Sequence, residues 1–205
     1  MINIRQLLFA LVFIVPGLLF AQSKVAVYGS IWEKGNESEC NWYFKGDLAC
    51  MQLIFKGAQN ETIETRLIMN SQTNKLTVVT KNNETETCIS VSADSIKKET
   101  KALLAFKSIG NSKEIENLGT CVRFNAKNHT NEYLVYVFEN NAISLHKFKN
   151  FIKNDIIFEF FSASVNHQFP AQALSTTSTG ELQRSFIVSS INDSFSEEIF
   201  AGACE

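Results

Sequence analysis

Residues 62–91 read TIETRLIMNSQTNKLTVVTKNNETETCISV, and this stretch decides the expected fold. Its first part alternates between apolar and polar side chains, with Ile63, Leu67 and Met69 on one side and Glu64 on the other. Alternation with a period of two residues is typical of a strand that is buried on one face only. The stretch therefore begins with a predicted half-buried strand.

The rest of the same stretch predicts a β-hairpin. Two runs of β-forming residues, 76–80 and 87–91, flank a polar turn at 82–83. Both turn residues are asparagine, which tolerates the positive φ angles of tight hairpin turns. A second hairpin is predicted over 133–148, with its turn at 140–141, where two asparagines again stand side by side.

Short apolar runs broken by Asn, Gly and Lys continue in both directions along the chain. They predict further strands at 25–32, 41–44, 48–55, 120–126, 155–165 and 182–191. The run 155–165 is long and very apolar, so we expect it near the centre of the sheet. Residues 166–180 contain Pro170 and a run of Ser and Thr, and we expect them to form a loop.

One segment departs from the strand pattern. Within residues 94–109, Ile96, Leu103 and Phe106 fall at helical spacing, and Gly110 can end the helix. Many short strands with a single helix predict an all-β protein. We expect a β-sandwich of the jelly-roll type, or alternatively a barrel, with one α-helix near 94–109.

The N-terminus has the pattern of a cleavable secretory signal. Arg5 is the only charge before an apolar run at 7–20, and Ala21 supplies a small residue at the exit. Spanning a bilayer takes about 20 apolar residues, so this run is short for a membrane helix. We therefore expect a signal peptide at 1–23 and a secreted, extracellular β-rich domain at 24–205. A division of that domain into two lobes near 110–119 is the alternative.

Five cysteines follow the signal, at positions 40, 50, 88, 121 and 204. Disulfides are the default in an oxidising compartment, and an odd number leaves one thiol over. We expect Cys40 to pair with Cys50 across a hairpin, and Cys88 to pair with Cys121 around the helix. Cys204 would then be unpaired, or would link two copies of the chain as a disulfide-bonded homodimer.

Asn-x-Ser/Thr sequences predict five N-glycosylation sites on a glycoprotein, at Asn36, Asn60, Asn83, Asn128 and Asn192. Each lies in a polar segment that is expected to form a turn or a strand end. Glycans would mark these positions as exposed. The enrichment over chance is mild, and the sequences carry no meaning if the source is a bacterium.

Composition and motifs disfavour several classes of function. Basic and acidic residues number 19 and 21 and are mixed along the chain, so no basic patch indicates nucleic acid. Cysteine and histidine spacings do not match a zinc site, and no calcium-loop, phosphate-loop or dinucleotide motif is present. No catalytic residues, metal or cofactor are therefore predicted. The sequence leaves open a glycosidase with distant carboxylates.

One local stretch resembles a known extracellular module. Residues 40–44 read CNWYF and are followed by LIF at 53–55, which is similar to the Cys-x-Trp-x-Ile pattern and following strand of CUB domains. That resemblance implies a β-sandwich with a binding role. The paired acidic calcium ligands and the later cysteine spacing of that family are not evident in this chain, so no family is assigned.

These observations favour a non-catalytic role outside the cell. We expect a secreted recognition protein that binds an extracellular protein or a glycan. The first alternative is a carrier of small hydrophobic ligands in a β cavity, indicated by 17 phenylalanines and the apolar run 155–165. The second is a secreted hydrolase with a dispersed active site.

Overall fold

The strands follow from the alternating pattern and form one antiparallel sheet in the computed structural model. The structure describes residues 24–83, 85–95, 106–110, 113–115, 118–139, 143–152, 161, 168–202 and 204. The strands are β1 (Lys24–Glu33), β2 (Asn36–Lys45), β3 (Leu48–Lys56), β4 (Thr62–Asn70), β5 (Lys75–Asn82), β6 (Thr85–Ser92), β7 (Lys107–Ser108), β8 (Lys113–Ile115), β9 (Gly119–Lys127), β10 (Asn131–Phe138), β11 (Pro170–Thr177) and β12 (Leu182–Asn192).

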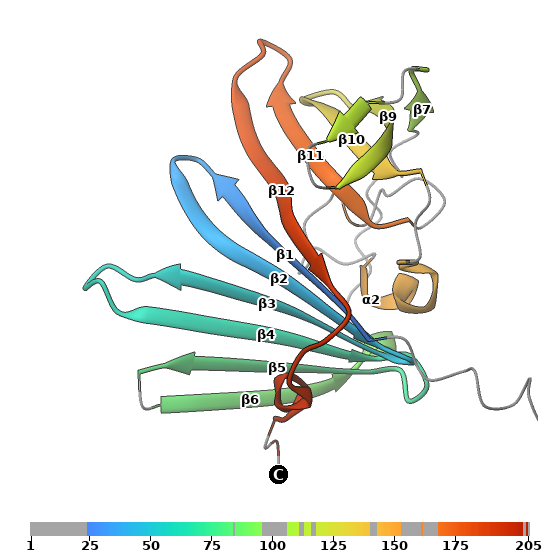
Figure 1. The fold of residues 1–205 in the computed structure, drawn as a ribbon. Coiled ribbons are helices and arrows are strands. Elements are labelled where there is room, and N and C mark those ends of the chain that lie inside the picture. Colours follow the sequence, from blue (N-terminus) through green and yellow to red (C-terminus); the bar gives the residue numbers. More distant parts are fainter. Residues whose placement is uncertain are drawn as a thin grey trace, which may run out of the picture.

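The strand order is β6-β5-β4-β3-β2-β1-β12-β11-β10-β9-β7, and β8 also pairs with β9. The sheet is open: β6 forms one edge, and the short β7 and β8 lie at the other. Figure 1 shows the sheet curling around the short helix α2 (Lys149–Ile152). We call the face toward α2 the inner face and the opposite one the outer face. The predicted all-β class is confirmed.

Tight turns set the register of the first strands. Lys34 and Gly35 both have positive φ, of 47° and 93°, and join β1 to β2 in a two-residue turn. Such turns match the twist of the flanking strands. Gly46, with φ of 59°, does the same between β2 and β3, where Lys45 is opposite Leu48. Every later pairing in these hairpins follows from these turns.

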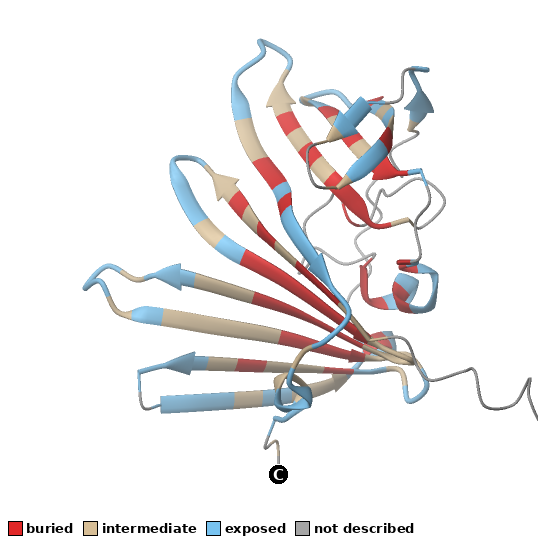
Figure 2. Ribbon diagram, in the orientation of Figure 1, coloured by how far each residue is buried: buried red, intermediate tan, exposed pale blue. Residues whose placement is uncertain are grey.

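The core lies on the inner face (Figure 2). Its centre is Trp42, which is fully buried and contacts the rings of Phe44, Phe161 and Phe169 at centroid distances of 5.9, 4.8 and 5.5 Å. Phe186 of β12 joins Phe161 at 4.9 Å. One aromatic cluster therefore ties the β1–β6 half of the sheet to β12.

The structure corrects two sequence predictions. Residues 143–148 do not form the second strand of a hairpin: Ser144 makes an isolated bridge to Gln168, and a 3₁₀ helix follows at His146–Phe148. Residues 170–177 form β11, not a loop. Its buried Ala171 and Ala173 are small because they lie beneath the aromatic core, and proline is tolerated at the first position of a strand.

Two other predictions fall largely outside the described residues. Of the helix expected over 94–109, the structure describes only the ends, a 3₁₀ turn at Ala93–Ser95 and the strand β7. Of the strand expected over 155–165, it describes only Phe161, which is buried. The signal peptide predicted at 1–23 also lies outside the described part of the chain. The two-lobe alternative stays a prediction.

Candidate functional site

The inner face of β3–β6 is organised in rows of residues that face one another across the strands. One row holds Ala49, Met69, Leu76 and Val91, and the next holds Met51, Leu67, Val78 and Ile89. Nearer the hairpin tips, the rows are Leu53, Thr65, Thr80 and Thr87, and then Phe55, Ile63, Asn82 and Thr85. The inner face is therefore apolar near the turns at 46–47 and 71–74. It is more polar near the turns at 57–61 and at Asn83.

The apolar end of this face, which holds the rows of Ala49 and Met51, is covered. Phe148, Phe151 and Ile152 are each at most 3% exposed and belong to the same core cluster as Met51 and Leu67. These residues come from the 3₁₀ helix at His146–Phe148 and from α2. The segment around α2 therefore closes one half of the inner face.

The second end, at the tips of β1–β6, is open. Phe55, near the tip of β3, is a large apolar side chain that remains 37% exposed. Ile89, 65% exposed, lies instead on the edge strand β6, in the row of Met51 and Leu67. Next to Phe55 is a cavity of about 380 Å³ lined by Ile31, Glu33, Lys34, Asn36, Ser38, Leu53 and Phe55. A second, more polar hollow is lined by Thr80, Asn82, Asn83, Thr85 and Thr87. We call this open end of the inner face the trough.

The trough continues the hydrophobic core without a break. Ile31 is 4% exposed and belongs to the core, and Leu53 packs against it. At one margin of the trough, Glu33 forms an ion pair with Arg184 of β12. The trough thus has an apolar floor, a row of threonines toward β6 and charged side chains at its rim.

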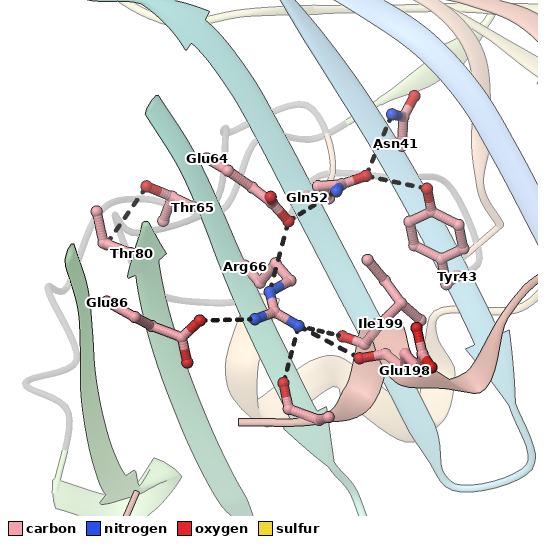
Figure 3. A network of polar contacts seen from close by, with 11 residues as sticks. Asn41, Tyr43, Gln52, Glu64, Thr65, Arg66, Thr80, Glu86, Glu198 and Ile199 are labelled. Atoms are coloured by element: carbon pink, nitrogen blue, oxygen red, sulfur yellow. Dashed lines mark hydrogen bonds and ion pairs between the residues drawn. The ribbon is translucent and has the colours of Figure 1, made fainter. Parts of the chain in front are cut away.

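The outer face carries a polar network instead (Figure 3). The Gln52 Oε1 atom accepts hydrogen bonds from the Tyr43 hydroxyl at 2.9 Å and from Asn41 Nδ2 at 3.4 Å. Gln52 Nε2 donates to Glu64 at 2.8 Å, and Glu64 lies 3.5 Å from Arg66 Nε. Burial of the phenol raises the pKa of Tyr43.

The C-terminal segment crosses this face; we call residues 195–202 with Cys204 the strap. Arg66 Nη1 donates to the carbonyl oxygens of Glu198, Ile199 and Ala201 at 3.4, 3.3 and 2.8 Å. The rings of Phe195 and Phe200 contact each other, and Phe195 contacts Tyr43 at 5.3 Å. The strap contains a 3₁₀ helix over Glu197–Phe200.

Glu197 holds the strap to the first two strands and makes the contact sensitive to pH. Its carboxylate pairs with Lys24 and Lys45, which lower its pKa from 4.5 to about 2. A depressed pKa contributes stability above the unfolded-state value, and that stability is lost as pH falls from about 4.5 toward 2.

We expect Glu197→Gln to flatten this part of the pH dependence of unfolding, measured by urea titration at several pH values. An unchanged slope would contradict the assignment.

The cysteine pairing differs from the prediction. Cys88 of β6 bonds to Cys204 of the strap, with Cα atoms 5.2 Å apart, and Cys40, Cys50 and Cys121 are free and buried. The predicted Cys40–Cys50 and Cys88–Cys121 bonds are therefore wrong, as is an unpaired Cys204. With Tyr43 opposite Cys50, the side chains of Cys40 and Cys50 lie on opposite faces of the sheet. Burial raises the pKa of both thiols to about 12.

The five predicted glycosylation positions are all exposed and lie in turns or at strand ends. Asn36 begins β2, Asn192 ends β12, and Asn60, Asn83 and Asn128 stand in or beside turns. Asn128 already uses its side chain, because Oδ1 accepts from the backbone N–H of Thr130 and Asn131. Their occupancy stays a prediction.

Within the described part of the chain, no three His, Cys, Asp or Glu side chains gather as metal ligands. The same residues contain no helix long and apolar enough to cross a membrane.

The sequence predicted neither the trough nor the strap. Alternation in β4 indicated which of its side chains share a face, but no local sequence pattern marks where the covered end of the inner face stops.

Comparisons with known proteins give only distant similarities. No family model and no curated protein matches the chain. An uncharacterized conserved protein from Thermus thermophilus is similar over 87% of this chain and 83% of its own, with a TM-score of 0.43 and 8% identity. MucB in complex with MucA(peri) is similar over 89% of this chain, with a TM-score of 0.40 and 12% identity. The match spans about half of that MucB chain, at 54%. These similarities are too distant to assign a function.

Proposed function

We propose that the protein is a non-catalytic binding protein that holds an elongated, largely apolar ligand in the trough. The observation that carries this proposal is the exposed Phe55 side chain beside a cavity that continues from the hydrophobic core. Leaving a large apolar side chain in water is unfavourable, by roughly 25 cal/mol per Å², and a concave, mostly apolar site is typical of ligand binding.

The shape of the trough supports a chain-like ligand with a polar end. An apolar chain would lie over Leu53 and Phe55, where the cavity of about 380 Å³ adjoins the core. Ligand pockets typically combine an apolar lining with a few polar groups that fix orientation. The side chains of Thr80, Thr87 and Asn82 would supply hydrogen bonds to a polar end toward β6.

A competition assay tests the proposal. We expect the fluorescent apolar probe N-phenyl-1-naphthylamine to bind the protein and to be displaced by palmitate. Phe55→Asp should weaken probe binding by roughly tenfold, because it places a charge beside the apolar chain.

The matched control is Ile187→Asp. Ile187 is 45% exposed, and its pairing with Ser30 places it on the outer face. The control should bind the probe like the wild type. Equal loss in Phe55→Asp and Ile187→Asp, or no saturable binding by the wild type, would overturn the proposal.

A second candidate is recognition of a glycan or a protein segment, favoured by the hollow at the β5–β6 tip. Its five lining residues are all Thr or Asn, whose hydroxyl and amide groups suit the hydroxyl groups of sugars or a peptide backbone. Screening the protein against a glycan array tests this candidate. Binding there that survives Phe55→Asp but is lost in Thr87→Val would favour it over the apolar ligand.

We further propose that the chain works in an oxidising compartment outside the cytoplasm. The leader-like residues 1–23 and the Cys88–Cys204 bond support export, because disulfides persist mainly in such compartments. Export through a eukaryotic secretory pathway would also allow glycans at the exposed asparagines. Intact mass of the protein from its native source, with and without reduction and N-glycosidase, tests the leader cleavage, the bond and the glycans together.

A further inference from the structure

The strap covers an apolar patch on the outer face. Ala26, Tyr43, Cys50, Ile68 and Val79 form a cluster of buried residues separate from the inner-face core, and Phe195, Ile199 and Phe200 pack against it. A methyl group added at Gly202 would lie 2.9 Å from Val79, so the strap backbone runs close to β5. Without the strap, this patch would face water.

Three cations surround the patch, and all of them contact the strap. Lys24 and Lys45 meet Glu197, and the Lys24 ammonium also lies 6.0 Å from the Phe195 ring centroid. Arg66 meets the strap carbonyl oxygens and, on its other side, Glu64 and Glu86. The surface is thus complementary to a short segment with aromatic side chains, a carboxylate and exposed carbonyl oxygens.

The strap is held covalently at both ends, by the chain that leaves β12 at Asn192 and by the Cys88–Cys204 bond. Its acidic residues Glu197 and Glu198 are exposed, and its apolar residues are only half-buried. Exposed ion pairs such as those of Glu197 contribute little to stability. The bond from Cys204 to Cys88 fixes the far end of the strap, so that without it this end can leave the patch while the chain stays attached to β12.

We infer that the strap fills a peptide-binding surface on the outer face, and that the Cys88–Cys204 bond decides whether this surface is closed or open to a partner segment that is acidic and aromatic. A dithiol reductant opens the surface by reducing the Cys88–Cys204 bond. The dithiol gives up two electrons and two protons, which convert the bond into two thiols, and is itself oxidised to a disulfide. The partner segment then takes the place of Phe195, Glu197 and Phe200. This inference does not rest on the trough, which lies on the other face.

Alkylation of Cys50 reports on strap release. Cys50 belongs to the patch beneath the strap, whereas Cys40 and Cys121 lie in the inner-face core and serve as internal controls. We expect a phosphine reductant to raise the alkylation rate of Cys50 by at least roughly tenfold and to leave Cys40 and Cys121 protected, since only the strap opens. Continued protection of Cys50 would show that the strap stays bound without the disulfide, and would overturn the inference.

Peptide titration tests the surface itself. The probe is a labelled peptide of the strap sequence, FSEEIFA, and the full-length receptor carries Phe195→Ser, Phe200→Ser and Cys204→Ser to weaken its own strap. We expect saturable binding to this receptor and none to the oxidised wild type. The charge-reversed peptide FSKKIFA is the control, and it should bind at least about tenfold more weakly.

Each remaining outcome counts against the inference. Equal binding of both peptides would contradict the role of Lys24, Lys45 and Arg66. Reactive Cys50 without peptide binding would show that the uncovered patch is not a docking surface. Neither result would affect binding of an apolar probe in the trough, so the two proposals fail separately.

Discussion

Cys204→Ser is expected to lower the free energy of unfolding by about 3–5 kcal/mol. The bond closes a loop between residues 116 positions apart, and long loops give a cross-link its largest effect on the unfolded chain. It also holds the strap over Tyr43, Ile68 and Val79. Urea unfolding followed by circular dichroism measures the loss.

Two controls isolate the bond. Cys88→Ser should cost the same as Cys204→Ser, and the double variant should cost no more than either, because all three lack one shared bond. The wild type in reductant should unfold like the variants in oxidising buffer. A loss below about 1 kcal/mol, or no effect of reductant on the wild type, would show that the bond does not stabilise the fold.

Trp42→Ala is expected to cost about 3–5 kcal/mol, the usual range for removing a large aromatic from a core. Trp42 is fully buried and contacts the ring of Phe44 on its own strand and those of Phe161 and Phe169 from distant parts of the chain. Removing the indole leaves a cavity between the β1–β6 half of the sheet and the residues that cover it. Thermal unfolding by calorimetry measures the effect.

The control for this prediction is Trp32→Ala. Trp32 lies on β1 and is only half-buried, so its truncation should cost clearly less than that of Trp42. Equal losses for the two tryptophans would mean that the cluster around Trp42 is not the centre of the core.

The strands of the first half of the sheet were predictable because their turns are local. Gly46-Asp47 supplies a two-residue turn and fixes Lys45 opposite Leu48. The same register excludes the Cys40–Cys50 bond, since it places the two side chains on opposite faces. The predicted bond was based only on the nine intervening residues, a length that fits a hairpin. It did not take into account that side chains alternate between the two faces of a strand.

The rest could not be predicted, for physical reasons that differ from case to case. β11 has the composition of a loop because Ala171, Ala173 and Ser175 are small where the sheet packs against large rings. The Cys88–Cys204 bond depends on the strap crossing the outer face, which no local pattern encodes. The trough depends on where the covering segment stops, and that is a property of the folded sheet.

The central claim is that an apolar ligand lies on the open end of the inner face. Methyl NMR with a stearate that carries a nitroxide near its methyl end tests it directly. We predict strong broadening of Ile31, which lines the trough, and of Ile63, which pairs with Phe55, with clearly weaker broadening of Ile54 and Ile187 on the outer face. Broadening of Ile54 and Ile187 to the same extent, or of none of the four, would contradict the account.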